Sequence, residues 1–349
     1  MTRATPPGHS ARSLELALPG ILVGALRWSP ADQGRAPSGR HLEILHGVTG
    51  NAMSWEGVGR SFAVDGWTVD ALDLPGHGRT RWTDDSGRPL PDQESVGRDR
   101  YGLRQVGEIV AHALRALPPI APGAAGGRRG TGSDGGAAGD SRGTGSDGAA
   151  AGGSLESGGG GASGGSFGAA DGGAGAAPVL LGHSWGTGVA IMAVDAGAPV
   201  SRLILLEPPF MTPQQGSEMA DSFAAELQPG LDLEAARTIA RQAGDTGYAL
   251  EARAHALVET SPLAADAISR GAPADPVALM VEWRTRHPDL PVDVIAGDPA
   301  AGGLIPAAML RLLRLALGSS HVHELPGVGH SPNRDDLDRL LAVLREIVA

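Results

Sequence analysis

The sequence predicts an α/β protein with a mostly parallel central sheet flanked by helices. Short apolar runs alternate with amphipathic helical segments along most of the chain, which is typical of parallel sheets built from strand-helix units. Several of these runs stop abruptly at small or polar residues. The length of 349 residues, 41% of them hydrophobic, allows a sizeable core in one large domain with insertions or in two domains.

Composition excludes several kinds of chemistry. The chain has no Cys, so it can have no disulfide, thiolate nucleophile or Cys-ligated metal. All 28 basic residues are Arg, which removes the Lys of a phosphate-binding loop, of a pyridoxal Schiff base and of a Ser-Lys dyad. The net charge of −11 argues against nucleic acid or an anionic membrane as partner. With no signal peptide in residues 1–12 and no membrane-spanning run, we expect a cytoplasmic protein that acts on a small molecule.

The N-terminal part predicts strands that end in polar loops. Residues 13–18 and 21–28 form a hairpin-like pair around Pro19-Gly20, and 101–117 carries a helical pattern. Two further strands end at loops with distinctive residues: 42–45 before His46-Gly47-Val48-Thr49-Gly50, and 67–72 before Asp73-Leu74-Pro75-Gly76-His77-Gly78-Arg79. A helical segment, 51–64, separates the two strands.

Residues 123–177 consist almost entirely of Gly, Ala, Ser and Asp. Because ordering such a segment costs entropy with no apolar burial to offset it, we expect a disordered insertion. It contains three matches to G-x-S-x-G, at Ser141, Ser163 and Ser166, and none follows an apolar run. A fourth match, Gly182-His183-Ser184-Trp185-Gly186, ends an apolar run and opens a helix. This context selects Ser184 as the serine of a sharp strand-to-helix turn.

The C-terminal part continues the alternation after one helical interruption. Residues 200–206 predict a strand ending at Glu207, and 208–290 show helical stretches near 217–227, 231–242, 248–260 and 275–286, which indicates a helical cap. A strand at 291–296 then ends at Gly297-Asp298. A helix at 306–317, a strand at 321–325 ending near Gly329-His330, and a final helix from Ser331-Pro332 complete the chain.

These strand ends carry the residues of nucleophilic catalysis. A serine needs a base within hydrogen-bond reach, and the base needs a carboxylate that fixes its tautomer. Ser184, Asp298 and His330 each follow a strand, and the carboxyl ends of parallel strands share one edge of the sheet. We therefore expect His330 to be the base.

We expect the other histidines near these strand ends to have structural roles rather than to act as the base. We expect His183 to point into the protein, and His46 and His77 to shape loops near the pocket. His321 and His323 alternate on a strand, as residues of one face or as a metal pair.

Four motifs in this order, namely His46-Gly47, the loop from Asp73 to Gly78, the Ser184 turn and Gly329-His330, resemble the α/β-hydrolase fold family. The resemblance covers nearly the whole chain outside the insertion. It implies a hydrolase core formed by 1–122, 178–207 and 291–349, with the insertion at 123–177 and the cap at 208–290. It also implies an oxyanion hole formed by the backbone N–H groups of Val48 and Trp185. Epoxide hydrolases and haloalkane dehalogenases of this fold use Asp where Ser184 stands.

The acid departs from the family pattern. Members often place an Asp three residues after a Gly at the end of the strand before the catalytic His, and that position is Ala300 here. Asp298 is the only carboxylate in this loop, so we expect it to be the acid. Glu207 lies at the other strand end that serves in this fold and is the alternative.

Together these features predict a serine hydrolase that forms an acyl-enzyme on Ser184 from a small or medium acyl substrate, such as an ester or lactone, and needs no cofactor or metal. An acyltransferase with the same triad and a non-catalytic ligand-binding protein are the alternatives. The sequence indicates neither the substrate nor the oligomeric state.

Overall fold

The structure is a computed structural model that describes residues 11–34, 37–118, 120, 177–227, 230–271 and 276–349. The described residues belong to one compact unit, Met1–Gly123 with Gly175–Ala349, and the second unit, Ala124–Ala174, lies outside them. The insertion expected at 123–177 therefore lies outside the described residues except for Ala177. None of the helices described is both long and apolar enough to cross a membrane.

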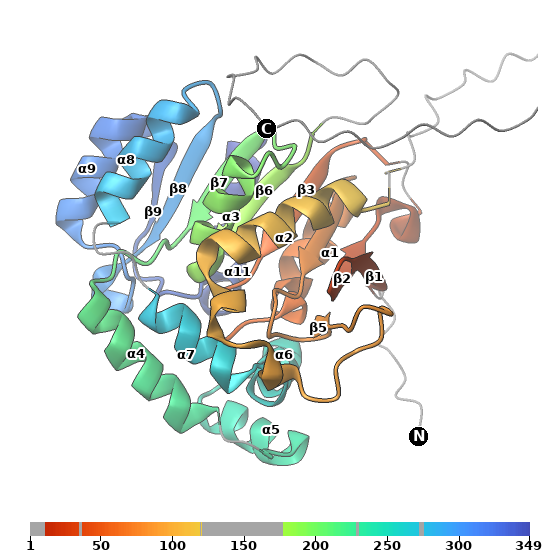
Figure 1. The fold of residues 1–349 in the computed structure, drawn as a ribbon. Helices are drawn as coiled ribbons and strands as arrows, with labels where there is room; N and C mark the ends of the chain where they lie inside the picture. Colours follow the sequence, from red (N-terminus) through yellow and green to blue (C-terminus); the bar gives the residue numbers. More distant parts are fainter. Residues whose placement is uncertain (1–10, 35–36, 119, 121–176, 228–229, 272–275) are drawn as a thin grey trace, which may run out of the picture. The chain divides into compact units, whose positions relative to one another are not determined.

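Within the described residues, nine strands form one sheet in the order β1-β2-β4-β3-β6-β7-β8-β9, with β5 paired to β2 (Figure 1). The N-terminal pairs of β2 with β1, β4 and β5 are antiparallel, and every pair from β4 to β9 is parallel. The strands are β1 (Arg12–Leu18), β2 (Ile21–Trp28), β3 (His41–Leu45), β4 (Thr68–Leu72), β5 (Arg81–Trp82), β6 (Val179–His183), β7 (Arg202–Leu206), β8 (Val292–Gly297) and β9 (Val322–Leu325).

The central strands are buried on both faces, which explains why they read as continuous apolar runs rather than alternating ones. In register, Leu45 pairs with both Leu72 and Gly182, and Leu206 pairs with His183. The loops that follow β3, β4, β6 and β7 consequently begin at the same edge of the sheet.

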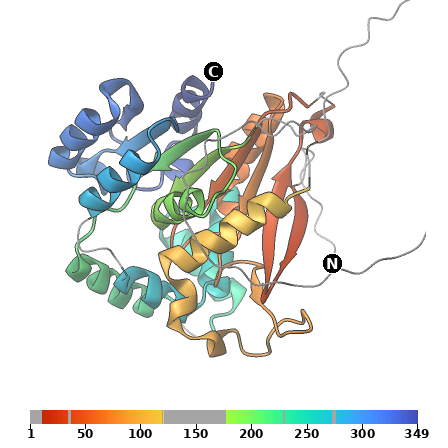
Figure 2. The ribbon, with the colours of Figure 1, turned by 45° about the horizontal axis from the view of Figure 1, so that its top comes forward.

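Helices cover both faces of the sheet (Figures 1 and 2). One face packs on α1 (Glu56–Val64) and α11 (Leu337–Ile347), which follows the short α10 (Pro332–Asp335). The other face packs on α2 (Leu103–Ala116), α3 (Trp185–Asp195) and α9 (Ala307–Leu317). In α2, Val106, Val110 and Leu114 recur at helical spacing and are buried, as the sequence pattern predicts.

Five helices lie between β7 and β8, one more than the sequence pattern predicts. They are α4 (Pro213–Glu226), α5 (Leu233–Gln242), α6 (Gly247–Glu259), α7 (Pro262–Arg270) and α8 (Pro276–Arg286). Helix α7 begins directly after α6, and its start is marked in the sequence by Ser261 as N-cap and Pro262 in the first turn. Helices α4 to α7 lie together at one end of the sheet, while α8 lies beside α9 (Figure 1) and buries Trp283 in the core.

Candidate active site

Ser184 lies between the end of β6 and the start of α3 in a strained conformation. Its φ of 53° and ψ of −124° are unusual for a residue with a side chain. A Cβ at Gly182 would overlap the carbonyl oxygen of Gly186, and one at Gly186 would lie 2.5 Å from the carbonyl oxygen of Leu45. Both glycines are therefore needed for the strand and the helix to pass this closely, which leaves the Ser184 hydroxyl at the edge of the sheet.

Glu207, at the end of the neighbouring strand β7, binds His330. The side chain is fully buried, and its backbone φ of 51° is the other positive value among the described residues that are not glycine. Oε1 accepts a hydrogen bond from Gly297 N at 2.6 Å, and Oε2 accepts one from Leu304 N at 2.7 Å. His330 Nδ1 lies 3.1 Å from Oε2. A carboxylate held by two backbone amides thus fixes the His330 ring with its Nε2 available.

Asp298 is not placed beside His330, and this corrects the expectation from the sequence. Its Oδ1 accepts from Ala300 N and its Oδ2 from Gly327 N, both at 2.8 Å. These backbone donors lower the pKa of Asp298. After Asp298 the chain turns into a short 3₁₀ segment, Pro299–Ala301, so the carboxylate caps its own loop and the next turn instead of reaching the histidine.

His183 supports the backbone of His330, a role that its place in the sequence does not predict. Its Nε2 donates to the carbonyl oxygen of His330 at 2.8 Å, and the two rings lie 5.0 Å apart. Burial, together with the nearby His330, lowers the pKa of His183 to about 3, so the ring is neutral and keeps one donor for this bond. The only signal in the sequence was its position next to Ser184. The amides of Gly297 and Leu304 were also missed, because backbone donors depend on loop geometry rather than on residue type.

Ser184 and His330 line the same cavity, of about 480 Å³. Among the described residues, the Ser184 hydroxyl makes no hydrogen bond to the His330 ring. Such bonds are often long in unliganded enzymes and shorten when substrate binds.

The loop after β3 packs against Ser184 and is held by His46. A Cβ at Gly47 would lie 2.9 Å from the Ser184 Cβ, so the loop needs glycine there. His46 Nδ1 lies 2.8 Å from the Gly47 carbonyl oxygen, while its Nε2 accepts from Leu74 N at 2.9 Å. Nδ1 therefore carries the proton and donates to Gly47. Because that carbonyl belongs to the same peptide as the Val48 N–H, this bond also fixes the direction of the Val48 N–H.

His77 contacts the same loop from the other side. Its Nε2 hydrogen-bonds the carbonyl oxygen of Val48, and its ring stacks on Trp185 at 6.1 Å between centroids. Trp185 is the first residue of α3, where backbone N–H groups have no partner within the helix. The expectation that His46 and His77 shape loops near the pocket agrees with these contacts.

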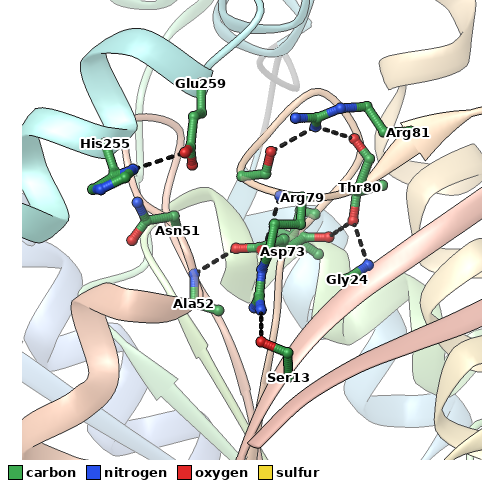
Figure 3. A network of polar contacts seen from close by, with 12 residues as sticks. Ser13, Gly24, Asn51, Ala52, Asp73, Arg79, Thr80, Arg81, His255 and Glu259 are labelled. Carbon is green, nitrogen blue, oxygen red and sulfur yellow. Dashed lines mark hydrogen bonds and ion pairs between the residues drawn. The ribbon is translucent and has the colours of Figure 1, made fainter. Parts of the chain in front are cut away.

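The loop after β4 is tied to its surroundings by Asp73 (Figure 3). Oδ1 accepts from Ala52 N at 2.7 Å, and Oδ2 accepts from the backbone and side chain of Arg79, both at 3.1 Å. Thr80 donates its hydroxyl to the Asp73 carbonyl and accepts from Gly24 N. Asp73 thus holds the loops after β3 and β4 together, and its carboxylate is not bonded to His330.

A second buried cluster lies away from Ser184, toward the amino ends of β3 and β4. His41, Glu43 and Asp70 have ligand atoms within 4.8 Å of one another, a spacing that could hold a metal ion. His41 Nε2 lies 2.8 Å from both carboxylates, and Arg27 donates two hydrogen bonds to Asp70 at 2.6 and 2.8 Å. We call these four residues the buried ion network. Two cations on two carboxylates already engage the atoms that a metal would need.

His321 and His323 share one partner at the far edge of the sheet. His321 Nδ1 and His323 Nε2 each lie 3.1 Å from Oδ1 of Asp293, which also pairs with Arg202. Only His323 lies in β9, since His321 ends the 3₁₀ segment Ser319–His321 before it, so the expected alternation of the two along one strand does not hold. Both rings nevertheless contact the same buried carboxylate.

The parallel sheet, the antiparallel N-terminal strands and the serine at a strained strand-to-helix turn define an α/β-hydrolase fold. The chain belongs to the alpha/beta hydrolase family, whose family model matches residues 44–343. The fold class and family expected from the sequence are thereby confirmed.

Solved structures with the same fold include several hydrolases. E-2-(acetamidomethylene)succinate hydrolase is 16% identical with a TM-score of 0.63, and covers 97% of this chain and 99% of its own. N-formylmaleamic acid deformylase from Pseudomonas putida S16 is 15% identical with a TM-score of 0.60, at 96% and 100% coverage. An epoxide hydrolase from Vigna radiata is 12% identical with a TM-score of 0.57, at 99% of each chain. The comparison with curated protein sequences gave no match. Identities this low establish the fold and leave the substrate open.

Proposed function

We propose that the protein is a serine hydrolase in which Ser184 is the nucleophile, His330 the general base and Glu207 the acid that orients the base. Glu207 replaces Asp298 in this role. The backbone N–H groups of Val48 and Trp185 form the oxyanion hole in this proposal. No residue of this set needs a cofactor.

The proposed reaction transfers an acyl group in two steps. His330 Nε2 takes the proton from Ser184 as its Oγ bonds to the substrate carbonyl carbon, and the two N–H groups stabilise the oxyanion. The bond to the leaving group then breaks, and His330 gives the proton to the departing oxygen. Water enters with His330 again as base, the acyl-oxygen bond to Ser184 breaks, and the serine regains its proton. Glu207 stabilises the imidazolium that exists in each step.

One arrangement supports this proposal most strongly: the strained Ser184 and the Glu207 that hydrogen-bonds His330 lie at adjacent strand ends. Strained conformations of residues other than glycine cost about 1–3 kcal/mol each and persist where the surroundings enforce them. Among the residues that the structure describes, the two with positive φ other than glycine are the proposed nucleophile and the proposed acid. A fold that needed only packing at these positions would use glycine.

A fluorophosphonate probe tests the proposal. We expect the wild-type protein to be labelled and Ser184→Ala not to be. Ser201→Ala is a matched control, since Ser201 lies just before β7 and its hydroxyl donates to the Pro178 carbonyl, away from the proposed site. Equal labelling of the wild type and Ser184→Ala, or no labelling of the wild type, would contradict the proposal. Product analysis with and without added alcohol then separates hydrolysis from acyl transfer.

A further inference from the structure

Two cavities of different character meet at Ser184. The smaller one, which we call the apolar lobe, has a volume of about 90 Å³. Its walls are largely aliphatic and aromatic, with side chains that include Leu103, Ile191, Phe210, Met211, Ile268 and Met280. The larger one, of about 480 Å³, we call the open cavity; it contains His330 and has mixed polar walls. Ser184 and Val48 line both, so a substrate carbonyl at the serine would extend one arm into each.

The charged side chain that lines the open cavity is basic, and no acidic side chain of the described residues accompanies it. Among the described residues, the cavity lining includes Arg334 and no Asp or Glu, although the chain has 39 acidic residues and a net charge of −11. Arg334 donates to the Ser331 hydroxyl at 2.9 Å and forms no ion pair with a carboxylate of the described part of the chain. The nearest acid along the turn, Asp335, accepts instead from the backbone N of Ser331 at 3.3 Å. A permanently charged guanidinium in such a wall is suited to a carboxylate, which it binds with two parallel hydrogen bonds.

The proposed chemistry decides which arm of the substrate faces Arg334. His330 must protonate the departing oxygen, so the leaving group lies on the side of His330. His330 lines the open cavity and is absent from the lining of the apolar lobe. The leaving group therefore occupies the open cavity and the acyl group occupies the apolar lobe. Because the lobe is much the smaller of the two cavities, at about 90 against 480 Å³, the acyl group that it takes is the shorter arm of the substrate.

We infer that the substrate joins a short apolar acyl group to a leaving group that carries a carboxylate, and that Arg334 binds this carboxylate. The inference rests on the proposed serine hydrolase function. It assigns Arg334 to substrate specificity and not to the chemical step, because the guanidinium acts on the far end of the leaving group.

Paired acetate esters test this inference. The first pair is 3-acetoxybenzoate and 3-acetoxybenzamide, which share the acetyl group and differ in the charge of the leaving group. We expect wild-type kcat/KM to favour the benzoate by about tenfold or more, equivalent to about 1.4 kcal/mol, and Arg334→Gln to abolish this preference, chiefly through KM. Arg334→Lys keeps the charge and should retain part of the preference. Arg311→Gln, at an exposed arginine of α9, is the control and should retain all of it.

A second pair tests the assignment of the arms. Monophenyl succinate carries its carboxylate on the acyl group, and phenyl butyrate is its neutral counterpart. We expect the wild type to prefer phenyl butyrate, because the lining of the apolar lobe contains no cationic side chain. The preference for 3-acetoxybenzoate should also weaken as salt rises from about 0.05 to 0.5 M, since screening acts on an exposed guanidinium. This measurement on the wild type keeps the test valid if Arg334→Gln does not fold.

The outcomes separate the two proposals. Equal kcat/KM for the first pair, or a preference that persists in Arg334→Gln, overturns the role of Arg334 while Ser184-dependent hydrolysis stands. A preference for monophenyl succinate overturns the assignment of the arms. Hydrolysis of both acetate esters by Ser184→Ala at the wild-type rate overturns the proposed function itself.

Discussion

Replacing Glu207 by Gln and Asp298 by Asn, one at a time, tests which of these two carboxylates orients His330. Glu207→Gln keeps the shape of the side chain but removes the charge that would stabilise the His330 imidazolium. Asp298→Asn makes the same chemical change on the next strand. Because both substitutions replace a carboxylate by an amide, a difference in activity between the two variants reports where each side chain lies relative to His330.

The contacts of Glu207 set the expected magnitude. Its two oxygens accept from Gly297 N, Leu304 N and His330 Nδ1. A glutamine has one acceptor oxygen, so in either amide orientation its NH₂ faces one of the two backbone N–H groups, at a cost of about 1–3 kcal/mol in stability. In one orientation the NH₂ also faces His330 Nδ1 and favours the wrong tautomer. We expect kcat/KM to fall about 10²- to 10⁴-fold. The lower bound is the smallest contribution typical of acid-base catalysis, and the upper bound is the loss caused by neutralising a triad acid.

Asp298→Asn should behave differently. Asparagine is as good a cap as aspartate, so the bond from Ala300 N can persist while the bond from Gly327 N is weakened. We expect kcat/KM to stay within about threefold of the wild type, because a surface substitution of this kind changes energies by about 0.5 kcal/mol.

Steady-state hydrolysis of 3-acetoxybenzamide, with urea unfolding of each variant, measures both effects. Stability must be compared first, so that only folded protein enters kcat/KM. A loss of two or more orders of magnitude in Asp298→Asn, with Glu207→Gln close to the wild type, would refute the assignment of Glu207.

Three further predictions concern the supports of the site and the buried ion network. Gly182→Ala should lower the free energy of unfolding by at least about 1–3 kcal/mol, because the new Cβ overlaps the rigid carbonyl of Gly186; an unchanged urea midpoint would contradict this. His77→Ala should lower kcat about tenfold with little change in KM, because the Val48 carbonyl loses its hydrogen bond and the loop that holds the Val48 N–H becomes less rigid. The loss is smaller than that expected from removing an oxyanion-hole donor itself. An unaltered kcat would argue against this role of His77. Although burial opposes it, the two carboxylates of the network raise the pKa of His41 to about 10. Burial raises the pKa of Glu43 to about 7, so the network is fully charged only above that pH. The stability from the His41 proton should decline as pH rises from about 7 and be lost by about 10. Urea unfolding should show this fall in the wild type and a smaller one in His41→Gln, and equal falls would count against it.

Much of the fold could be predicted because each central strand is a short apolar run that ends at a small or polar residue. The runs before His46, Asp73 and Ser184 correspond to β3, β4 and β6 within one or two residues. The elements that the sequence did not predict are a very short strand and the boundary between two consecutive helices. The two-residue strand β5 is too short to show periodicity, and α7 follows α6 with only a capping serine and a proline to mark the boundary.

The candidate site could be predicted as far as its strand ends and no further. Ser184 and His330 were placed by the turns that carry them, because parallel strands bring those turns to one edge. The choice between Asp298 and Glu207 could not be made this way, since both follow parallel strands. It depends on which carboxylate the backbone amides of Gly297 and Leu304 hold toward the histidine, and amide direction is not encoded in residue type.

Because the proposed acid, Glu207, follows β7, the turn after β8 does not have to supply a catalytic side chain. In a protein whose acid occupies that turn, selection must preserve both its length and its side chain. Here the turn contributes the amide of Leu304 to Glu207, while the side chain of Asp298 braces this turn and the one at Gly327. Relatives that share this arrangement should therefore keep the glutamate, while position 298 should accept other residues that can cap the turn, such as Asn or Ser.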